Sequence, residues 1–571
     1  MIRPRHSGAG TARSMGIVRP SGVSSAVSSG VRMITRRQAV RGATPLLLGA
    51  LGGCAVSGSA VAQRETIAAG PFETMVWARG FEGQRRADLG DGRFLNPVFA
   101  GDHPDPAILK DAEDYYVTFS SFDAYPGLLI WRSHDLVNWS PVAPALHTPI
   151  GSVWAPDLVK HDGRYFLYIP ARTPERRSIY VIHADRIEGP WSEPVDLDLP
   201  RHIDPGHAVG EDGERWLFLS GGDRVRLAAD GLSTVGDVEH VYDPWKYPET
   251  WTVESFSPEG PKIFRRGDYF FLVTAVGGTA GPPTGHMVIV ARSRSIHGPW
   301  EDCPHNPVMR TWSAAEKWWS RGHASLVEGP RGDWWMMCHG YENGFWTLGR
   351  QALLAPVRWR DDGWPEVRGG DLSRPVAKPV SGATATHGMA LSDDFARNRL
   401  GQLWTFYDPA PDEASRLVVD ASGLHLAAKG TSPTDSSPLC FIAGDLSYEV
   451  EADITIEPDC EAGLLLFYSR RLYAGLGFDR AGLAMHRYGR SRRSVLAAGS
   501  TDRLFIRIRN DRHIVTIHTS VDGQTWTRFG VQMEVSGYHH NTDGDFLSLR
   551  PALYAAGRGS ARVRRVSYRA V

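Results

Sequence analysis

Short runs of apolar and aromatic residues recur between residues 96 and 368, and they predict buried β-strands. Examples are DYYVTFS, RYFLYIP, DYFFLVTA and DWWMMCH, whose length and composition suit strands buried on both faces. Each run follows a turn rich in Asp or Gly and precedes another strand, and this unit occurs five times. Strand-built repeats of roughly 40–50 residues are typical of a β-propeller. We therefore predict five propeller blades over residues 96–368.

A different strand pattern occupies residues 391–571. Its segments alternate apolar and polar positions between Gly, Asp and Asn turns, as in LSYEVEADITIEP and RLFIRIRNDRHIVTIHTSV. This alternation predicts antiparallel strands packed as a β-sandwich. Residues 369–390 lack periodicity and are rich in Pro, Gly and small side chains, so we expect a linker there. The predicted fold class is all-β, a five-bladed propeller followed by an antiparallel sandwich, with residues 63–95 leading into the propeller.

Residues 1–62 are predicted to lie outside the fold. The first 32 residues contain five Arg, no acid and many Ser and Gly, a composition typical of disorder. A pair of arginines, Arg36 and Arg37, then precedes a short apolar stretch that is too Gly-rich to span a bilayer permanently. This arrangement resembles a bacterial twin-arginine export signal, although Ala39 stands where such signals usually carry Phe.

Two processing sites compete after these arginines. The run LGGC ends at Cys54 and resembles a lipoprotein cleavage box, which would make Cys54 the lipidated first residue. The run Ala60-Val61-Ala62 instead fits an ordinary signal-peptidase site and soluble release. Both predict an exported protein, whether periplasmic, held at a membrane by a lipid anchor, or secreted.

The net charge and the cysteine content argue against nucleic-acid binding and against a fold held by many disulfides. The formal net charge is −1, so no long-range attraction to nucleic acid is expected. Five cysteines are too few for a disulfide framework, although Cys440 and Cys460 could pair if neighbouring strands bring them together. The oligomeric state is not indicated by the sequence.

Alignment of the five repeats brings polar residues into one ring. The copies begin HPDPAILKD, WAPDLVKHD, HIDPGHAVGED, SPEGPKIFRRG and RGHASLVEG. Equivalent residues on the innermost strands of a closed propeller converge on its axis, which predicts a pocket surrounded by Asp105, Asp157, Asp204, Glu259 and His323. Each acid taken alone could simply cap its own turn. Facing carboxylates repel one another and lose hydration, so we favour a functional role for the set.

Two carboxyl groups on opposite sides of a bond between sugars are the equipment for glycoside hydrolysis. The long side chain of Glu259 suits protonation of a glycosidic oxygen, and Asp105 lies in a rigid His-Pro-Asp-Pro turn that suits deprotonation of a water. A third acid, Asp204, would keep the proton on Glu259 by like-charge repulsion. The expected substrate is an oligosaccharide or a polysaccharide.

Six ordered motifs resemble glycoside hydrolase family 43, namely NPVFAGDHPDPAIL, VWAPDL, HIDPG, SPEGPKIF, RGHASLV and TLGRQALL. The segment EAGLLLFYSRRLYAGLGFD is similar to the concanavalin-like domain appended to the β-xylosidases of that family. The resemblance implies a five-bladed propeller that hydrolyses β-xylosides or α-L-arabinofuranosides with inversion.

The same resemblance implies roles for individual polar residues. Asp105 would be the general base, Asp204 the group that adjusts the pKa and orients, and Glu259 the general acid. Arg350 would bind substrate hydroxyls, because a guanidinium fork suits paired hydroxyls, although a salt bridge to Asp204 is the alternative.

Other matched positions are less specific. Phe122 and Trp154 would be apolar walls of a sugar subsite, or else plain core aromatics. His323 matches the central histidine, which in many members binds a calcium ion or a water network on the axis. The resemblance therefore implies no required cofactor and offers a structural Ca²⁺ at His323 as the metal to look for. Asp157 departs from the WAPHL form of many xylosidases, which leaves the sugar open rather than the family.

Three other functions remain open. The chain could be a sugar-binding propeller without activity, a glycosidase of another specificity such as a galactosidase or a retaining fructosidase, or an adhesion protein that uses the sandwich. Retaining carboxyl pairs lie roughly 5–5.5 Å apart and inverting pairs roughly 6.5–9.5 Å apart. A loop before His323 carries Trp312, Trp318 and Trp319, which would stack on sugars if exposed and brace the loop if buried.

Overall fold

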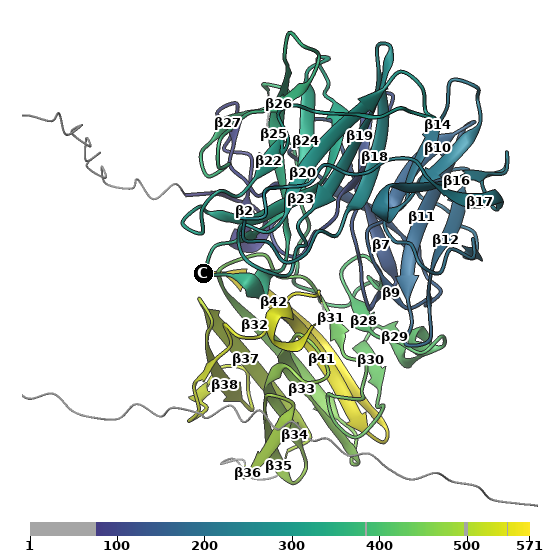
Figure 1. Ribbon diagram of the computed structural model, residues 1–571. Helices are drawn as coiled ribbons and strands as arrows, with labels where there is room; N and C mark the ends of the chain where they lie inside the picture. Colours follow the sequence, from purple (N-terminus) through teal and green to yellow (C-terminus); the bar gives the residue numbers. More distant parts are fainter. Residues whose placement is uncertain (1–75, 383–384, 496–500, 545) are drawn as a thin grey trace, which may run out of the picture. The chain divides into compact units, whose positions relative to one another are not determined.

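The computed structural model describes residues 76–382, 385–495, 501–544 and 546–571. Five antiparallel sheets stand around a common centre, and two further sheets pack as a sandwich (Figure 1). The all-β fold class and the five-bladed arrangement predicted from the sequence are confirmed. The predicted leader, Arg36, Arg37 and Cys54 lie outside the described residues. Within the described ranges, no helix has the length and apolar character that a membrane crossing would need.

Each blade is a four-stranded meander in which consecutive strands pair. In chain order the blades comprise β4 (Ala107–Asp111), β5 (Asp114–Thr118), β7 (Gly127–Ser133) and β8 (Ser140–Leu146); β10 (Asp157–His161), β11 (Arg164–Arg172), β12 (Arg177–Ala184) and β13 (Val195–Asp196); β14 (Gly206–Val209), β15 (Arg215–Phe218), β16 (Asp223–Leu227) and β17 (Thr234–His240); β18 (Glu259–Arg266), β19 (Tyr269–Val276), β20 (Met287–Ser293) and β21 (Glu301–Asp302); and β23 (Trp318–Glu328), β24 (Trp334–Glu342), β25 (Gln351–Trp359) and β26 (Pro365–Val367). Two short strands, β9 (Ser152–Val153) and β22 (Met309–Arg310), extend the second and fourth blades.

The ring closes through its innermost strands. Each of β4, β10, β14, β18 and β23 contacts the next in this order, and β23 contacts β4. The segment before the first blade is bonded to the last blade. The Asn96 side chain donates to the Leu354 carbonyl at 3.0 Å and accepts from the Leu354 amide at 2.8 Å. Phe99 also pairs with Ala352. Residues at the inner ends of these strands therefore meet around one axis.

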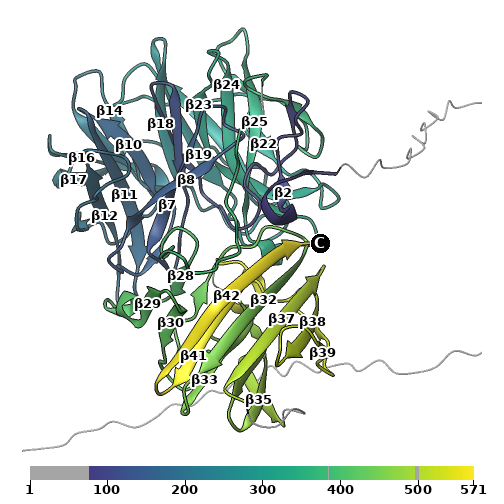
Figure 2. The same ribbon diagram turned by 180° about the vertical axis from the view of Figure 1, so that it is seen from behind.

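The sandwich consists of two antiparallel sheets (Figure 2). One sheet has the order β36 (Arg490–Ser494), β35 (Gly482–Arg487), β34 (Tyr473–Asp479), β33 (Cys460–Phe467), β41 (Arg550–Gly557), β31 (Leu439–Cys440), β28 (Thr405–Tyr407) and β6 (Ala124–Tyr125). The other has the order β29 (Leu417–Asp420), β30 (Gly423–Ala427), β42 (Ser560–Ala570), β32 (Ser447–Ile456), β37 (Arg503–Asp511), β38 (Ile514–Ser520) and β39 (Thr527–Arg528), with β40 (Met533–Glu534) beside β38. Strand β6 belongs to the first-blade region, so the propeller contributes an edge strand to the sandwich.

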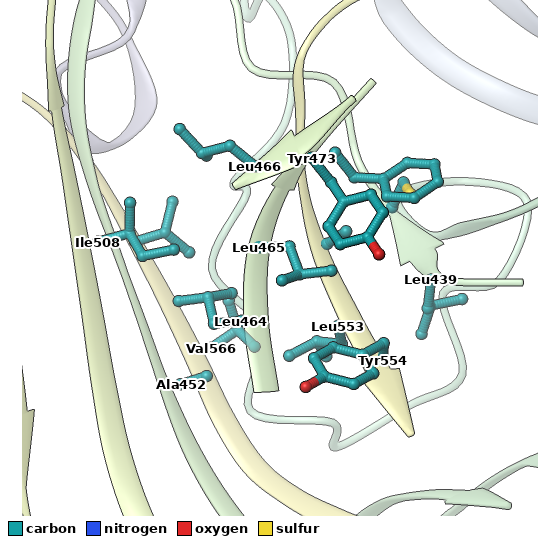
Figure 3. Close-up of a cluster of buried hydrophobic side chains, with 14 of the residues drawn as sticks. Leu439, Ala452, Leu464, Leu465, Leu466, Tyr473, Ile508, Leu553, Tyr554 and Val566 are labelled. Carbon is teal, nitrogen blue, oxygen red and sulfur yellow. The ribbon is translucent and has the colours of Figure 1, made fainter. Parts of the chain in front are cut away.

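Apolar side chains fill the space between the two sandwich sheets. Leu464 of β33 points toward Ile508 and Val566 of the opposing sheet, and all three are buried (Figure 3). The alternation that predicted the strands thus supplies the core. Cys440 and Cys460 are separate buried thiols, because they pair with β41 at Ala552 and Gly557, far apart along that strand, so the disulfide considered from the sequence does not form.

The described residues also form four 3₁₀-helical turns, η1 (Phe81–Gly83), η2 (Ser220–Gly222), η3 (Trp346–Leu348) and η4 (Glu413–Arg416). Four short strands and one α-helical turn remain. They are β1 (Ala78–Arg79), β2 (Arg85–Arg86), β3 (Arg93–Phe94), β27 (Val376–Ala377) and α1 (His540–Asp543). The pairing of β3 with β27 joins the segment before the propeller to the segment after it.

Candidate active site

A cavity of about 110 Å³ lies where the innermost strands converge. This is several times the roughly 10–15 Å³ that one water needs, and it suits a small ring. Seven of the eight pocket residues that the sequence predicts line it, together with four others: Asp105, Phe122, Trp154, Asp204, Glu259, His323 and Arg350, and Ala155, Ile203, Thr279 and Phe546. A larger cavity of about 150 Å³ lies elsewhere, and its buried Asp102 is already paired with Arg550.

Tight turns aim two of the acids into the cavity. Asp105 and Asp204 have φ angles of 57° and 55°, each precedes a proline, and each lies two residues before an innermost strand. His323 shares this left-handed conformation with φ of 47°. Such angles are uncommon for residues other than glycine and are tolerated best by Asp and Asn. The Asp-Pro pairs are therefore the local device that turns both carboxyl groups toward the axis.

The equivalence predicted for Asp157 is wrong. Asp157 begins strand β10, whereas the residue two positions before that strand, and the one that lines the cavity, is Ala155. Asp157 is held outside the cavity by Lys262, whose Nζ lies 2.6 Å from Asp157 Oδ1. Asp157 lies two residues farther along the chain than Ala155, the residue of this blade that lines the cavity, so the second blade supplies no carboxylate to the pocket.

Asp105 is the most heavily bonded acid of the cavity. Its Oδ1 accepts a hydrogen bond from Arg350 Nη1 at 2.8 Å and lies 3.0 Å from His339 Nδ1, while Ser120 Oγ donates to Oδ2 at 2.5 Å. Burial alone would raise the pKa of Asp105, but the Arg350 guanidinium leads the opposing interactions and the pKa lies well below its ordinary value. Asp105 is therefore ionised, and Arg350 pairs with it rather than with Asp204.

Glu259 has the opposite environment. Its side chain is 18% exposed, and the nearest imidazole nitrogen, Nε2 of His286, is 4.0 Å from Oε1. Burial raises the pKa of Glu259 well above its ordinary value, and the negative charges of Asp204 and Asp105 raise it further. The pKa of Asp204 is also raised, by burial and by Asp105, but Lys262 and Arg350 oppose that shift. The pKa of Asp204 rises to about 8, so both acids hold a proton more tightly than an ordinary carboxyl group does.

Aromatic rings form the walls. The Phe122 ring stacks on Phe546 with centroids 6.0 Å apart, and the Arg350 guanidinium lies 5.5 and 5.1 Å from these two rings. Phe122 is buried, while Trp154 is half-buried and lies beside Arg172, whose guanidinium is 5.9 Å from its ring. A flat apolar wall beside a fixed charged group is typical of pockets that bind small polar ligands.

Of the four lining residues that the sequence did not predict, Phe546 is the aromatic one. It follows α1 in the sandwich, more than 400 residues from Asp105, in a loop without periodicity or motif. No pattern in the sequence could have located it. The loop tryptophans do not line the cavity: Trp318 is fully buried, Trp319 bonds to the Ala314 carbonyl, and Trp312 is 62% exposed with its ring against Trp251.

The residues around His323 show how well this position suits the calcium ion that the family resemblance implies. Among the described residues, Glu259, His286 and His323 form a group whose possible ligand atoms lie within 4.8 Å of one another. Two imidazoles and one carboxylate are a donor set for transition metals, whereas calcium takes six to eight oxygens. The nearby positive charge of Lys262 also opposes a second cation. The site therefore fits calcium poorly.

Comparison with known proteins places these features in a family. The sequence profile described as Glycosyl hydrolases family 43 matches residues 94–365, and that of the Beta xylosidase C-terminal Concanavalin A-like domain matches residues 392–569. Two curated relatives are a non-reducing end alpha-L-arabinofuranosidase, BoGH43B, from Bacteroides ovatus (33% identical, 61% of this chain and 68% of the relative) and a xylan 1,3-beta-xylosidase from Vibrio sp (28% identical, 76% and 90%). The crystal structure of the GH43 BlXynB protein from Bacillus licheniformis shares the fold, with a TM-score of 0.74 at 24% identity over 84% of this chain and 100% of that chain.

Proposed function

This chain belongs to glycosyl hydrolases family 43 and is a glycoside hydrolase, and from that premise we propose that it cleaves β-xylosides or α-L-arabinofuranosides with inversion. One observation carries the proposal: Asp105 and Glu259 line the same buried cavity, with pKa values displaced in opposite directions. Such a pair supplies an ionised base and a protonated acid at one pH. Pentosides are favoured because the relatives named above are an arabinofuranosidase and a xylosidase.

In the proposed reaction Asp105 takes a proton from a water as the oxygen of that water bonds to the anomeric carbon. The glycosidic bond breaks on the opposite side, and Glu259 gives its proton to the leaving oxygen. Ser120 and Arg350 hold the Asp105 carboxylate in place through bonds of 2.5 and 2.8 Å. Asp204 contributes the negative charge that keeps the proton on Glu259.

The experiment that tests the proposal is hydrolysis of nitrophenyl β-xyloside, α-L-arabinofuranoside, β-galactoside and a fructoside. NMR of the first-formed product then reports its anomeric configuration. We expect turnover of at least one pentoside and a product of inverted configuration. A retained product would favour the fructosidase-like alternative. Binding of sugars without any turnover would favour a non-catalytic propeller, and both outcomes contradict the proposal.

The aromatic wall from the sandwich gives a prediction about substrate binding. Replacement of Phe546 by Ala is expected to raise KM for the pentoside roughly fivefold, since one aromatic contact is worth about 1 kcal/mol. The acids keep their contacts, so kcat should change little. Tyr488→Ala, which truncates a half-exposed sandwich aromatic, is the matched control. Equal KM values for the two variants would exclude Phe546 from the sugar site.

We also propose that the protein is exported through the twin-arginine route, on the basis of Arg36 and Arg37. Replacement of both arginines by Lys should leave the protein in the cytoplasm of an expressing bacterium, as cell fractionation would show. A Cys54→Ala variant separates the two processing sites, because only a lipoprotein would leave the membrane fraction on this change. Unaltered export of the double-Lys variant would reject the route.

A further inference from the structure

A buried ammonium group occupies the propeller axis beyond the cavity. Lys262 lies on β18 of the fourth blade, and its Nζ donates to Asp157 Oδ1 at 2.6 Å and to the Pro156 carbonyl at 2.8 Å, both in the second blade. It also lies 3.4 Å from the carbonyl of Pro205 in the third blade. A side chain that reaches from one blade to two others crosses the centre of the ring.

The innermost strands pack closely around Lys262. A Cβ atom on Gly206 would lie 2.0 Å from the Pro261 carbonyl oxygen, so only glycine lets β14 approach β18 this closely. On the other side of the ring, Ser325 Oγ donates to the Pro106 carbonyl at 2.7 Å. Within a strand, residues two apart share a face, and Asp157, Gly206 and Ser325 each lie two residues beyond a residue that lines the cavity. These residues form the next level of the axis.

The oxygens around Lys262 Nζ are the kind that a hard cation takes. Calcium sites are built from carboxylates and backbone carbonyls. An ammonium has three donors and satisfies three such oxygens without a bound ion. Both side chains of the pair with Asp157 are only 10% exposed, so the charges depend on each other.

We propose that the Lys262 ammonium is a built-in cation on the propeller axis, so that this glycosidase works without the calcium ion that the family resemblance leads one to expect. Lys262 acts as a positioning residue. Its charge opposes the upward shift in the pKa of Asp204, and it holds the second and third blades together beside Asp204. The proposal rests on the proposed function for its catalytic consequence, whereas its ion-binding consequence can be measured without substrate.

The wild-type protein gives the first test, with thermal melting and pentoside hydrolysis measured after chelation with EDTA. We expect chelated protein to keep its melting temperature and its kcat, and added CaCl₂ to change neither. A fall in melting temperature on chelation that CaCl₂ reverses would overturn the proposal, even if no substrate were ever hydrolysed. Failure of the proposed function would instead appear as absent turnover with an unchanged melting temperature.

The second test removes the ammonium and keeps its oxygen partners. In Lys262→Ala we expect at least a tenfold loss of kcat with little change in KM, because the sugar-facing walls are untouched. Millimolar methylammonium chloride or CaCl₂ should restore part of the kcat and raise the melting temperature. Lys110→Ala, on innermost strand β4 but in a surface ion pair of 3.7 Å, should respond to neither addition. An active Lys262→Ala at the wild-type kcat, or one that no cation restores, would contradict the proposal, and the wild-type test stands if this variant does not fold.

Discussion

Replacement of Glu259 by Gln is expected to lower kcat on an unactivated pentoside oligomer by about 10²–10⁴-fold, the usual contribution of a general acid. Gln keeps the size of the side chain but has no acidic proton to give to the leaving oxygen. A nitrophenolate leaves with little need for a proton, so the loss on a nitrophenyl glycoside should be much smaller. Steady-state kinetics on the two substrates measures this difference.

The pH dependence of the same variant separates catalysis from misfolding. In the proposed mechanism the rate requires a protonated Glu259, whose pKa is raised well above its ordinary value by burial and then by Asp204 and Asp105. The wild-type rate should therefore persist through neutral pH and be lost only as the pH rises through the raised pKa. The Gln variant has no proton to lose there, so its residual activity should show no such alkaline fall. The exposed residue Glu249 provides the control, and Glu249→Gln should behave as wild type. An alkaline fall that survives in Glu259→Gln would assign the acid elsewhere.

The propeller and most of its pocket could be predicted because one signal occurs repeatedly. The recurring aromatic strands predicted the five blades, and the Asp-Pro turns indicated that Asp105 and Asp204 line the central cavity. Closure of a ring then converts positions that are distant in sequence into neighbours. No finer geometry was needed to bring Asp105, Asp204 and Glu259 into one cavity.

The features that escaped prediction depend on packing between segments with no shared pattern. The sequence predicted Asp157 in the pocket, but Asp157 lies two residues beyond Ala155, which lines the cavity, and this shift moves its side chain to the next level along the axis. There it meets Lys262, a partner that only the three-dimensional closure reveals. Phe546 reaches the pocket from the sandwich, which the sequence presented as a separate unit.

The sandwich is tied to the catalytic machinery by more than Phe546. Asp102 lies three residues before Asp105 and bonds to Arg550 of β41 at 2.9 Å, with both side chains buried. The loop that carries Phe122 continues into β6, which pairs with β28 of the sandwich. Loss of one partner from a buried ion pair costs about 3–5 kcal/mol. The sandwich thus stabilises the position of Asp105, the proposed base, and of Phe122 in the aromatic wall.

Replacement of Asp105 by Asn is expected to reduce kcat by at least about 10²-fold, with little change in KM, because an amide cannot take a proton from water. Asn can still accept the hydrogen bond from Ser120, but Arg350 loses its ionic partner at 2.8 Å. Kinetics should show the loss on oligomers and on nitrophenyl glycosides alike, since attack by water limits both. This equal loss distinguishes the base from the acid, whose removal spares the activated substrate.

The melting temperature of Asp105→Asn and the pH dependence of its rate should also change, because the substitution removes a negative charge from the cavity. Without the Asp105 carboxylate the Arg350 guanidinium is buried and unpaired, so the melting temperature should fall. The negative charge of Asp105 also raises the pKa of Glu259, so any residual activity should lose its alkaline side at a lower pH than wild type. Asp111 lies at the far end of β4, the strand that follows Asp105, and forms a surface ion pair with Lys160 of β10. Asp111→Asn should change neither kcat nor the pH at which the rate falls on the alkaline side. Asp204→Asn should likewise move the alkaline fall in rate to a lower pH. It should keep more kcat than Asp105→Asn, because Asp204 acts through Glu259 and takes no proton from water. If the kcat of Asp105→Asn were within tenfold of the wild-type kcat, another group would have to activate the water.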